Sequence, residues 1–413
     1  MTLVLPSRRA ALMPGQWVHN ALWRSAKAVP SLDLRFADSK SLVDSRTGQS
    51  LITFTRASSA TYIDSAGTLQ TAAVDVPRFD HNPTTGESLG LLVEEQRTNL
   101  LLRSEEFDNA SWNPPDPSIA TVTPNAQTAP NGTLTADTFA TVSGTPAIFQ
   151  AVACLASTAY TWSFYVKLGT MAAADFRFAV RDDTNGAFIA ADIAPSITPV
   201  TTEWRRVTYT FTTPVGCVLV RPYLYRFSPA TYGTTVHLWG AQLEAGAFAT
   251  SYIPTTTAAA TRSADVASIT GANFSSWYRQ SEGTVFVNAI NPALSTTLFS
   301  ASDGTANNRI QADAGISARV ARVVTGGITQ ANNTIAYTFG TQQQFALSYV
   351  LNSINFANAG TLGTEDTSAT IPTVDQLRLG ANPTGAGALN STIKRLAFFP
   401  QRLSNSTLQA ITQ

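Results

Sequence analysis

Charged residues are scarce in this chain of 413 residues. Asp, Glu, Lys and Arg together make up 13% of the sequence, about half the share of an ordinary globular protein. The 27 basic and 27 acidic residues give a formal net charge of zero, and the sequence has no acidic tail or basic arm. Because nucleic-acid binding depends on an excess of positive charge, this balance excludes the usual electrostatic footprint of a nucleic-acid-binding protein.

Cysteine and histidine are also rare. The two cysteines, Cys154 and Cys217, are too few for a disulfide scaffold. Both lie in apolar strand-like context, which predicts small buried side chains, and a bridge between neighbouring strands is the alternative. The histidines His19, His81 and His237 are each isolated, and the HExxH, CxxC and P-loop patterns are absent. Metal-dependent or triad hydrolysis is therefore not expected.

No run approaches the roughly 18 consecutive apolar residues of a membrane span. The first residues, MTLVLPSRRAALMPG, are interrupted by Pro6, Arg8, Arg9 and Pro14, so they lack the apolar segment of a signal peptide. We therefore expect synthesis in the cytoplasm, without the general secretory route.

The sequence does contain abundant strand-like alternation. Its hydrophobic content of 44% is sufficient for globular cores. In residues 110–254, short alternating runs are separated by Gly, Pro and Asn; in one of them Trp162 and Phe164 face one way and Ser163 the other. Regularly spaced short strands predict two packed antiparallel sheets. Residues 270–413 repeat this rhythm, so the expected fold class is all-β, with two antiparallel β-sandwiches behind an N-terminal attachment region.

The N-terminal segment predicts a short helix, broken at Pro14 and resumed before residue 27. It is too small to bury its tryptophans alone, so we expect it to dock on a partner or on sister chains; a frayed leader is the alternative. The candidate attachment residues are Trp17, Leu22 and Trp23.

A Thr/Ala-rich run follows Tyr252-Ile253-Pro254. Pro254 disfavours helix at Ile253 and cannot donate to a strand ladder, so the run predicts an extended connector with no apolar face to bury. The predicted domains are an N-terminal anchor (1–31), a β-rich attachment region (32–109), a first β-sandwich (110–254), a linker (255–269) and a second β-sandwich (270–413).

Three parts of the chain resemble known families. The pieces FTRASSATY, VPRFD and GLLVEEQRTNLLL, in this order within about residues 50–110, closely resemble a segment of many tailed-bacteriophage structural proteins. YTWSFYVK, WRRVTYTF and LWGAQLE, in residues 110–254, resemble a carbohydrate-binding-module jelly roll. The ending STIKRLAFFPQRLS resembles that of concanavalin-A-like (laminin-G-like) lectin sandwiches in phage proteins, and Ser404 is placed to cap one final helical turn.

These resemblances imply a phage virion protein, a tail or head fibre or receptor-binding component that presents lectin-like domains to host surface glycans. Other virion proteins and host cell-surface polysaccharide are the implied partners, and a homotrimer is the implied assembly. A capsule or lipopolysaccharide depolymerase and a ligand-free decoration protein are the alternatives. Neighbouring carboxylates such as Glu94-Glu95 point to opposite faces of a strand and do not form a glycosidase pair, so no catalytic residue is expected.

Sugar binding needs an aromatic platform beside polar groups, because pyranose rings stack on aromatic faces. The glycan-binding candidates, which alternate onto one face of VLVRPYLYRF, are Arg221, Tyr223, Tyr225 and Phe227. That the tyrosines fill the sandwich core is the alternative. Weak candidates for a Ca²⁺ site are Asp182, Asp183 and Asn185, where a hairpin turn is the favoured alternative. No other cofactor is expected.

Overall fold

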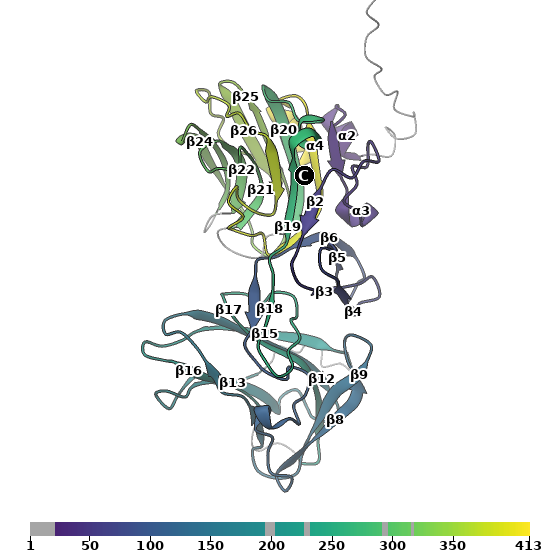
Figure 1. Ribbon diagram of the computed structural model, residues 1–413, viewed down its shortest axis with the longest axis vertical. Coiled ribbons are helices and arrows are strands. Elements are labelled where there is room, and N and C mark those ends of the chain that lie inside the picture. Colours follow the sequence, from purple (N-terminus) through teal and green to yellow (C-terminus); the bar gives the residue numbers. More distant parts are fainter. Residues whose placement is uncertain (1–20, 195–202, 227–231, 291–295, 315–317) are drawn as a thin grey trace, which may run out of the picture. The chain divides into compact units, whose positions relative to one another are not determined.

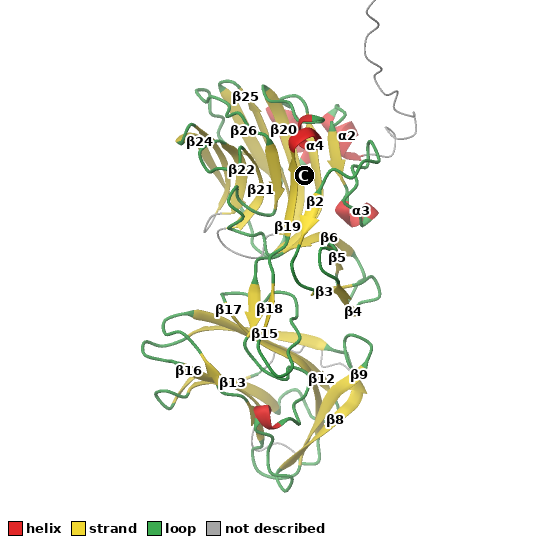
Figure 2. Ribbon diagram, in the orientation of Figure 1, coloured by secondary structure: helices red, strands yellow, loops and turns green. Residues whose placement is uncertain are grey.

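The computed structural model describes residues 21–194, 203–226, 232–290, 296–314 and 318–413 (Figure 1). Strands make up 48% of the chain and helices 7%, so the protein is all-β, as predicted (Figure 2). The chain forms two compact units. Unit 1 contains the described residues up to Phe54 together with Ser88–Glu94 and Val266–Gln413, and unit 2 contains Thr55–Glu87 and Glu95–Asp265.

Unit 1 contains two antiparallel sheets. The first has the strand order β27 (Thr361–Leu362), β26 (Ser353–Asn358), β25 (Gln342–Val350), β20 (Glu282–Ile290), β29 (Ser391–Phe399), β6 (Ser88–Val93), with β1 (Leu32–Leu34) also on β29. The second has the order β2 (Thr53–Thr55), β19 (Val266–Thr270), β28 (Gln376–Leu379), β21 (Thr296–Ser302), β22 (Arg309–Ala314), β23 (Ala318–Thr325), β24 (Ile328–Ala336). Segments expected in a separate attachment region thus lie in the same unit as the C-terminal strands.

Helices from both ends of the described chain pack on one face of the first sheet. The helices of unit 1 are α2 (Ala21–Ala26), α3 (Phe36–Ser39), α4 (Gly271–Ser275) and α5 (Asn405–Ile411). Residues of α2 and α5 share a hydrophobic cluster with Phe286 of β20 and Phe399 of β29. Ser404 caps α5, since its Oγ accepts a hydrogen bond from the backbone N–H of Thr407 at 3.2 Å. The predicted final helical turn is therefore confirmed.

The structure buries two of the predicted attachment residues. Leu22 is 8% exposed and Trp23 is 2% exposed, and Trp23 Nε1 donates a hydrogen bond to Asp33 Oδ2 at 3.1 Å. The expectation that this segment lacks partners within its own chain is therefore wrong for Leu22 and Trp23, because the C-terminal strands and α5 supply a core for them. Trp17 lies outside the described residues.

Unit 2 is built around two further antiparallel sheets. One has the order β10 (Ala147–Phe149), β16 (Leu219–Arg226), β13 (Phe176–Asp182), β14 (Ala187–Ile193), with β11 (Val152–Ala153) also on β16. The other has the order β15 (Arg205–Thr212), β12 (Ala159–Leu168), β17 (Thr235–Ala245), β9 (Leu134–Thr141), β8 (Ala120–Thr128). The smaller elements are β3 (Ala60–Ile63) paired with β4 (Leu69–Ala72), β7 (Arg97–Asn99) paired with β18 (Ala260–Arg262), β5 (Arg78–His81) and the 3₁₀ turn Ala110–Trp112.

The predicted alternation of β12 is present in the structure. Trp162 and Phe164 are fully buried in the core that both sheets share. Tyr165, on the opposite face, packs edge-on against Trp239 and Tyr252, with ring centroids 5.5 and 6.3 Å away. The strand is therefore covered on both faces, which explains why it is apolar almost throughout.

The Thr/Ala run after Pro254 bends at residues 256–258 before it enters β18 at Ala260, and it is not a free connector. Ser104 Oγ accepts a hydrogen bond from Thr255 N at 2.8 Å, and β18 pairs with β7 over three residues. Thr255, Arg262 and Asp265 are buried. As expected, the run has no apolar face to bury, since Ala258 and Ala259 are exposed. It is nevertheless bonded within unit 2, where Thr255 Oγ1 accepts a hydrogen bond from Ser104 N at 3.2 Å.

Three charged residues that are distant in the sequence meet inside unit 2. Asp265 accepts hydrogen bonds from Arg56 Nη1 at 3.1 Å and from Arg78 Nη2 at 2.5 Å, and the three side chains are fully buried. Burial lowers the pKa of Arg56, against the opposing influence of Asp265. Arg56 and Arg78 come from the pieces FTRASSATY and VPRFD, so these phage-like pieces contribute to a buried ion cluster.

The buried carboxyl group of Asp137 should make stability depend on pH. Its two oxygens accept hydrogen bonds from Phe107 N at 2.6 Å and Asn125 N at 3.0 Å, yet burial raises its pKa from 3.8 to about 6. The folded state therefore binds this proton more tightly than the unfolded state. The contribution of Asp137 to stability should be greatest below about pH 4 and fall as the pH rises to about 6, by up to roughly 3 kcal/mol.

This pH dependence can be measured by urea unfolding of the wild-type chain and the Asp137→Asn variant between pH 4 and pH 7. The variant has no titrating group at this position, so the difference in unfolding free energy between the two proteins isolates the contribution of Asp137. A difference that stays constant over this range would contradict the prediction.

Candidate functional site

The glycan-binding candidates lie on β16, whose two faces differ. The buried positions are Val220, Pro222 and Leu224. The partly exposed positions between them are Arg221, Tyr223 and Tyr225. Because alternate strand residues point to opposite faces, these three lie away from the sandwich core, and the alternative that the tyrosines fill the core is wrong. Phe227 lies outside the described residues.

Tyr223 lies among aromatic rings from other strands of the same sheet. Phe149 of β10 is its direct cross-strand partner, with ring centroids 4.8 Å apart and planes inclined at 39°. The ring of Phe188, on β14, lies 6.1 Å from Tyr223, and this side chain is 55% exposed. We call Phe149, Phe188, Arg221 and Tyr223 the aromatic face.

Arg221 is held against these rings. Its guanidinium carbon lies 4.7 Å from the Phe149 centroid and 5.9 Å from that of Tyr223, and Nη1 donates to the Tyr223 hydroxyl at 3.1 Å. Asp183 forms ion pairs with Arg221 and, at 3.2 Å, with Arg181. Since the Asp183 side chain is only 4% exposed, this carboxylate fixes the guanidinium beside the rings in advance of any ligand.

Tyr225 has a different role from Tyr223. Its hydroxyl donates to Asp192 Oδ1 and accepts from Asp192 N at 2.8 Å. Burial and the Asp192 carboxylate raise the pKa of Tyr225, so the hydroxyl stays protonated at neutral pH. The hydroxyl is thus used to connect β16 to the end of β14, which leaves the ring as the part of Tyr225 that a ligand could contact.

The weak Ca²⁺ candidates form a hairpin turn between β13 and β14. Asp182 O accepts a hydrogen bond from Gly186 N at 2.9 Å, and the Asp182 carboxylate accepts from Asn185 N and Nδ2 at 3.0 and 2.7 Å. Asp183 is engaged by two arginines, as described above. The carboxylate oxygens of this loop are thus bonded within the turn and to the arginines beside the aromatic face. The described residues contain no group of three or more His, Cys, Asp or Glu that could hold a metal ion.

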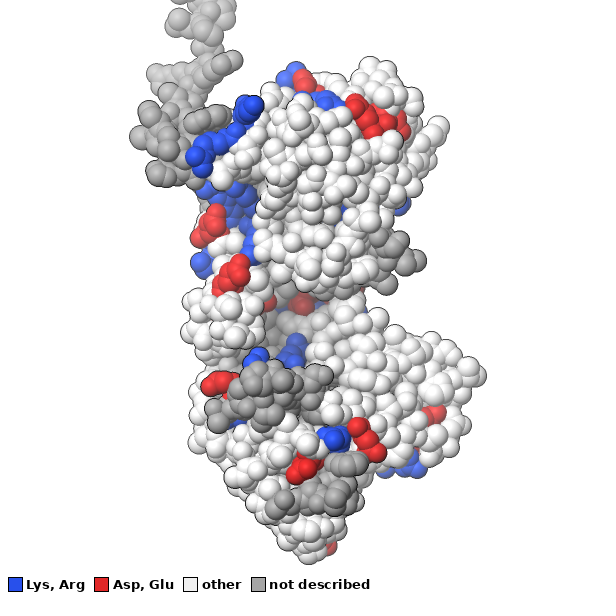
Figure 3. Space-filling view, turned by 180° about the vertical axis from the view of Figure 1, so that it is seen from behind, with Lys and Arg blue, Asp and Glu red and all other residues white. Residues whose placement is uncertain are grey.

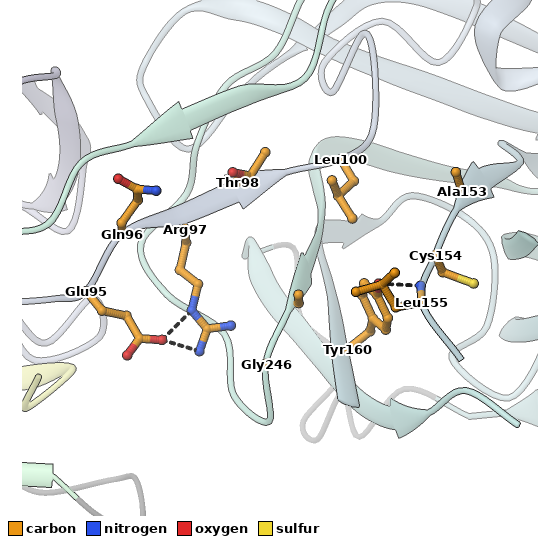
Figure 4. Close-up of a pocket in the computed structure, with 11 residues that line it drawn as sticks. Glu95, Gln96, Arg97, Thr98, Leu100, Ala153, Cys154, Leu155, Tyr160 and Gly246 are labelled. Atoms are coloured by element: carbon orange, nitrogen blue, oxygen red, sulfur yellow. Dashed lines mark hydrogen bonds and ion pairs between the residues drawn. The ribbon is translucent and has the colours of Figure 1, made fainter. Parts of the chain in front are cut away.

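Unit 2 also contains a cavity of about 650 Å³ (Figure 4). It is lined by Glu95, Gln96, Arg97, Thr98, Leu100, Ala153, Cys154, Leu155, Tyr160, Ala245 and Gly246. Glu95 Oε1 accepts from Arg97 Nε at 2.7 Å at one end, whereas Leu155 N donates to the Tyr160 hydroxyl at 2.9 Å at the other (Figure 4). Glu95 is the one carboxylate among these lining residues, so they do not provide the carboxylate pair of a glycosidase.

Alternation on β16 identified Arg221 and Tyr223 but missed Phe149 and Phe188, and Asp183 was predicted only as a weak Ca²⁺ ligand. Phe149 and Phe188 lie on separate strands, and their approach to Tyr223 depends on strand register. The available signal was alternation in the run AFIAADI, which places Phe188 with Asp192 on the face opposite Ile189 and Ile193.

No protein-family model matches the sequence, and no curated protein matches it. None of the helices in the described part of the chain has the length and apolar character needed to cross a bilayer.

Parts of the chain are similar to parts of solved structures. A botulinum neurotoxin type G receptor-binding domain matches 35% of this chain and 38% of its own length, at 8% identity and a TM-score of 0.27. The enzymatically active domain of bacteriophage CBA120 tailspike protein 4 matches 36% of this chain and 21% of its own, at 18% identity and a TM-score of 0.28. Trypanosoma rangeli sialidase matches 35% of this chain and 25% of its own, at 13% identity and a TM-score of 0.27. The chain therefore spans about a fifth to two fifths of these proteins, and similarities this low carry no functional argument.

Proposed function

We propose that the chain binds carbohydrate through the aromatic face of unit 2. The observation that carries this proposal is the set of partly exposed rings on one sheet, with Arg221 held beside them by Asp183. Sugar rings stack on aromatic side chains, and a fixed guanidinium can donate hydrogen bonds to ring hydroxyls. The surface seen in Figure 3 carries few charged side chains over most of its area, which suits recognition by stacking and hydrogen bonds more than by charge.

We propose binding rather than glycoside cleavage. Asp183 and Asp192, which bond to Arg221 and Tyr225 of β16, are both engaged, Asp183 by two arginines and Asp192 by Tyr225. A glycosidase needs one carboxyl group to protonate the leaving oxygen and a second to act as base or nucleophile. Carboxylates that are committed to ion pairs and structural hydrogen bonds are poorly suited to both tasks.

We propose that the protein belongs to a phage virion, as a tail or head fibre component that presents its sandwiches to polysaccharide on the host surface. The proposed partners are other virion proteins, and the proposed assembly is a homotrimer. This part of the proposal is supported by the resemblance of about residues 50–110 to tailed-phage structural proteins. Immunogold labelling of purified particles with an antibody to this chain tests it. Absence of label from intact particles would overturn the virion setting and leave the carbohydrate proposal open to its own test.

Phe188→Ala should weaken glycan binding without unfolding the protein. Loss of one stacked ring is expected to reduce affinity by about 1–3 kcal/mol, or roughly 5- to 150-fold, by analogy with bases stacked on aromatic side chains. Because Phe188 is 55% exposed, its removal should change the unfolding free energy by no more than about 0.5 kcal/mol. Binding can be measured on arrays of bacterial surface polysaccharides and then by calorimetry with a polysaccharide that binds.

Phe339→Ala is the matched control, since it removes a phenyl ring that is 38% exposed and lies in unit 1. The double variant Phe188→Ala/Tyr223→Ala should abolish measurable binding. Full binding by the double variant would place the sugar site elsewhere, and a wild-type chain that binds no polysaccharide would favour the ligand-free decoration protein. Release of reducing ends from a bound polysaccharide would instead favour the depolymerase.

A further inference from the structure

The two cysteines of the chain lie side by side in unit 2, although 62 residues separate them in the sequence. Cys154 follows β11, and its backbone N–H donates to Val218 O at 2.9 Å. Cys217 closes the turn before β16, with its N–H donating to Pro214 O at 3.2 Å. Because both backbones are fixed at the same end of this sheet, the two Sγ atoms are 3.6 Å apart.

The two thiols differ in access. Cys154 is 9% exposed and lines the cavity described above, where Figure 4 shows its side chain among the lining residues. Cys217 is fully buried. Because Cys154 is the more exposed of the two, a small reagent reaches its sulfur first, although Figure 4 shows that this sulfur points away from the other lining side chains. Cys217 is then close enough to react with Cys154.

We propose that Cys154 and Cys217 form a thiol–disulfide modification site, which closes by exchange with a small organic disulfide. The Cys154 thiolate attacks one sulfur of the reagent, forming a mixed disulfide and releasing one small thiolate. The Cys217 thiolate then attacks Cys154 Sγ, forming the Cys154–Cys217 bond and releasing the second small thiolate. The protein loses two protons and two electrons, and the reagent gains both as two small thiols.

The burial of the two thiols determines how fast the disulfide forms. Burial raises the pKa of Cys154, and burial with hydrogen bonding to Cys154 and Asp182 raises the pKa of Cys217 to about 12. Since the thiolate is the attacking species, closure should be slow at neutral pH and the dithiol should persist during synthesis in a reducing cytoplasm. Once closed, the bond joins residues far apart in the unfolded chain and restricts that chain.

The reduced full-length protein should be incubated with 2-hydroxyethyl disulfide at mildly alkaline pH and examined by intact mass spectrometry and non-reducing peptide mapping. The expected product has lost the mass of two hydrogen atoms and contains linked Cys154 and Cys217 peptides. Its unfolding equilibrium constant in urea should be roughly 30- to 1,000-fold smaller than that of the reduced protein.

Two variants test the order of attack. Cys217→Ser should accumulate a mixed disulfide on Cys154, whereas Cys154→Ser should react far more slowly, because the remaining thiol is fully buried. The wild-type measurement needs neither variant to fold. Persistence of the wild-type dithiol, accumulation of mixed disulfide without closure, or a closed form that unfolds more readily than the reduced form would each overturn the proposal.

Discussion

Replacing Asp265 with alanine should lower the free energy of unfolding by about 3–5 kcal/mol, since it leaves buried arginines without their shared carboxylate. Arg56 and Arg78 both bond to Asp265, and all three side chains are fully buried. An arginine cannot relieve the loss by giving up its proton, because its pKa is too far above neutral. Two other hydrogen bonds of Arg78, to Thr61 O and Ser251 Oγ at 2.8 Å, are to neutral atoms.

Urea unfolding at pH 7 measures this effect. Asp108→Ala is the control, because Asp108 is an exposed carboxylate of the same unit, and its removal should change stability by no more than about 0.5 kcal/mol. Asp265→Asn keeps an acceptor oxygen but removes the charge, so its loss of unfolding free energy should fall between those of Asp265→Ala and Asp108→Ala. If Asp265→Ala were as stable as the control, the ion cluster would not contribute to the fold of unit 2.

Trp23→Ala should destabilise the chain by about 3–5 kcal/mol, as expected when a buried tryptophan is removed from a core. Trp23 is 2% exposed, packs in the cluster that contains Leu408 and Ile411, and bonds to Asp33. The variant leaves a large cavity between α2 and α5 and removes the indole donor from a buried carboxylate. Scanning calorimetry of the purified variant measures the loss.

Leu351→Ala provides the control for Trp23→Ala, because Leu351 is 60% exposed in the same unit. A stable Trp23→Ala protein that no longer assembled with its partners would contradict the structural role and support attachment through this residue. A destabilised protein would show that Trp23 serves the core of unit 1.

Features that depend on neighbouring residues could be predicted from the sequence. Alternation in TWSFYVKL correctly separated Trp162 and Phe164 from Ser163, because strand periodicity is local. The cap at Ser404 was predicted for the same reason, since an N-cap acts on backbone N–H groups two or three residues away. The alternation of Arg221 and Tyr223 likewise placed both on one face, although their binding role stays a prediction.

Features that depend on distant pairing could not be predicted. Leu32–Leu34 bonds to Leu396–Phe398, and nothing in either short segment specifies the other. The same limit applies to Asp265, which lies in a stretch interpreted as a connector but neutralises arginines about 190 and 210 positions earlier in the chain. Phe149 joined the candidate site only through its register with Tyr223.

The position of β29 in the first sheet has a consequence for the order of synthesis. This strand pairs with β20 along one edge and with β1 and β6 along the other. A ribosome completes β1 some 360 residues before it completes β29, an interval on the order of 20–70 s at typical elongation rates. Through that interval Leu32 and Leu34 have no native strand partner on β29. The apolar side chains of β1 must therefore be kept from aggregation until β29 emerges.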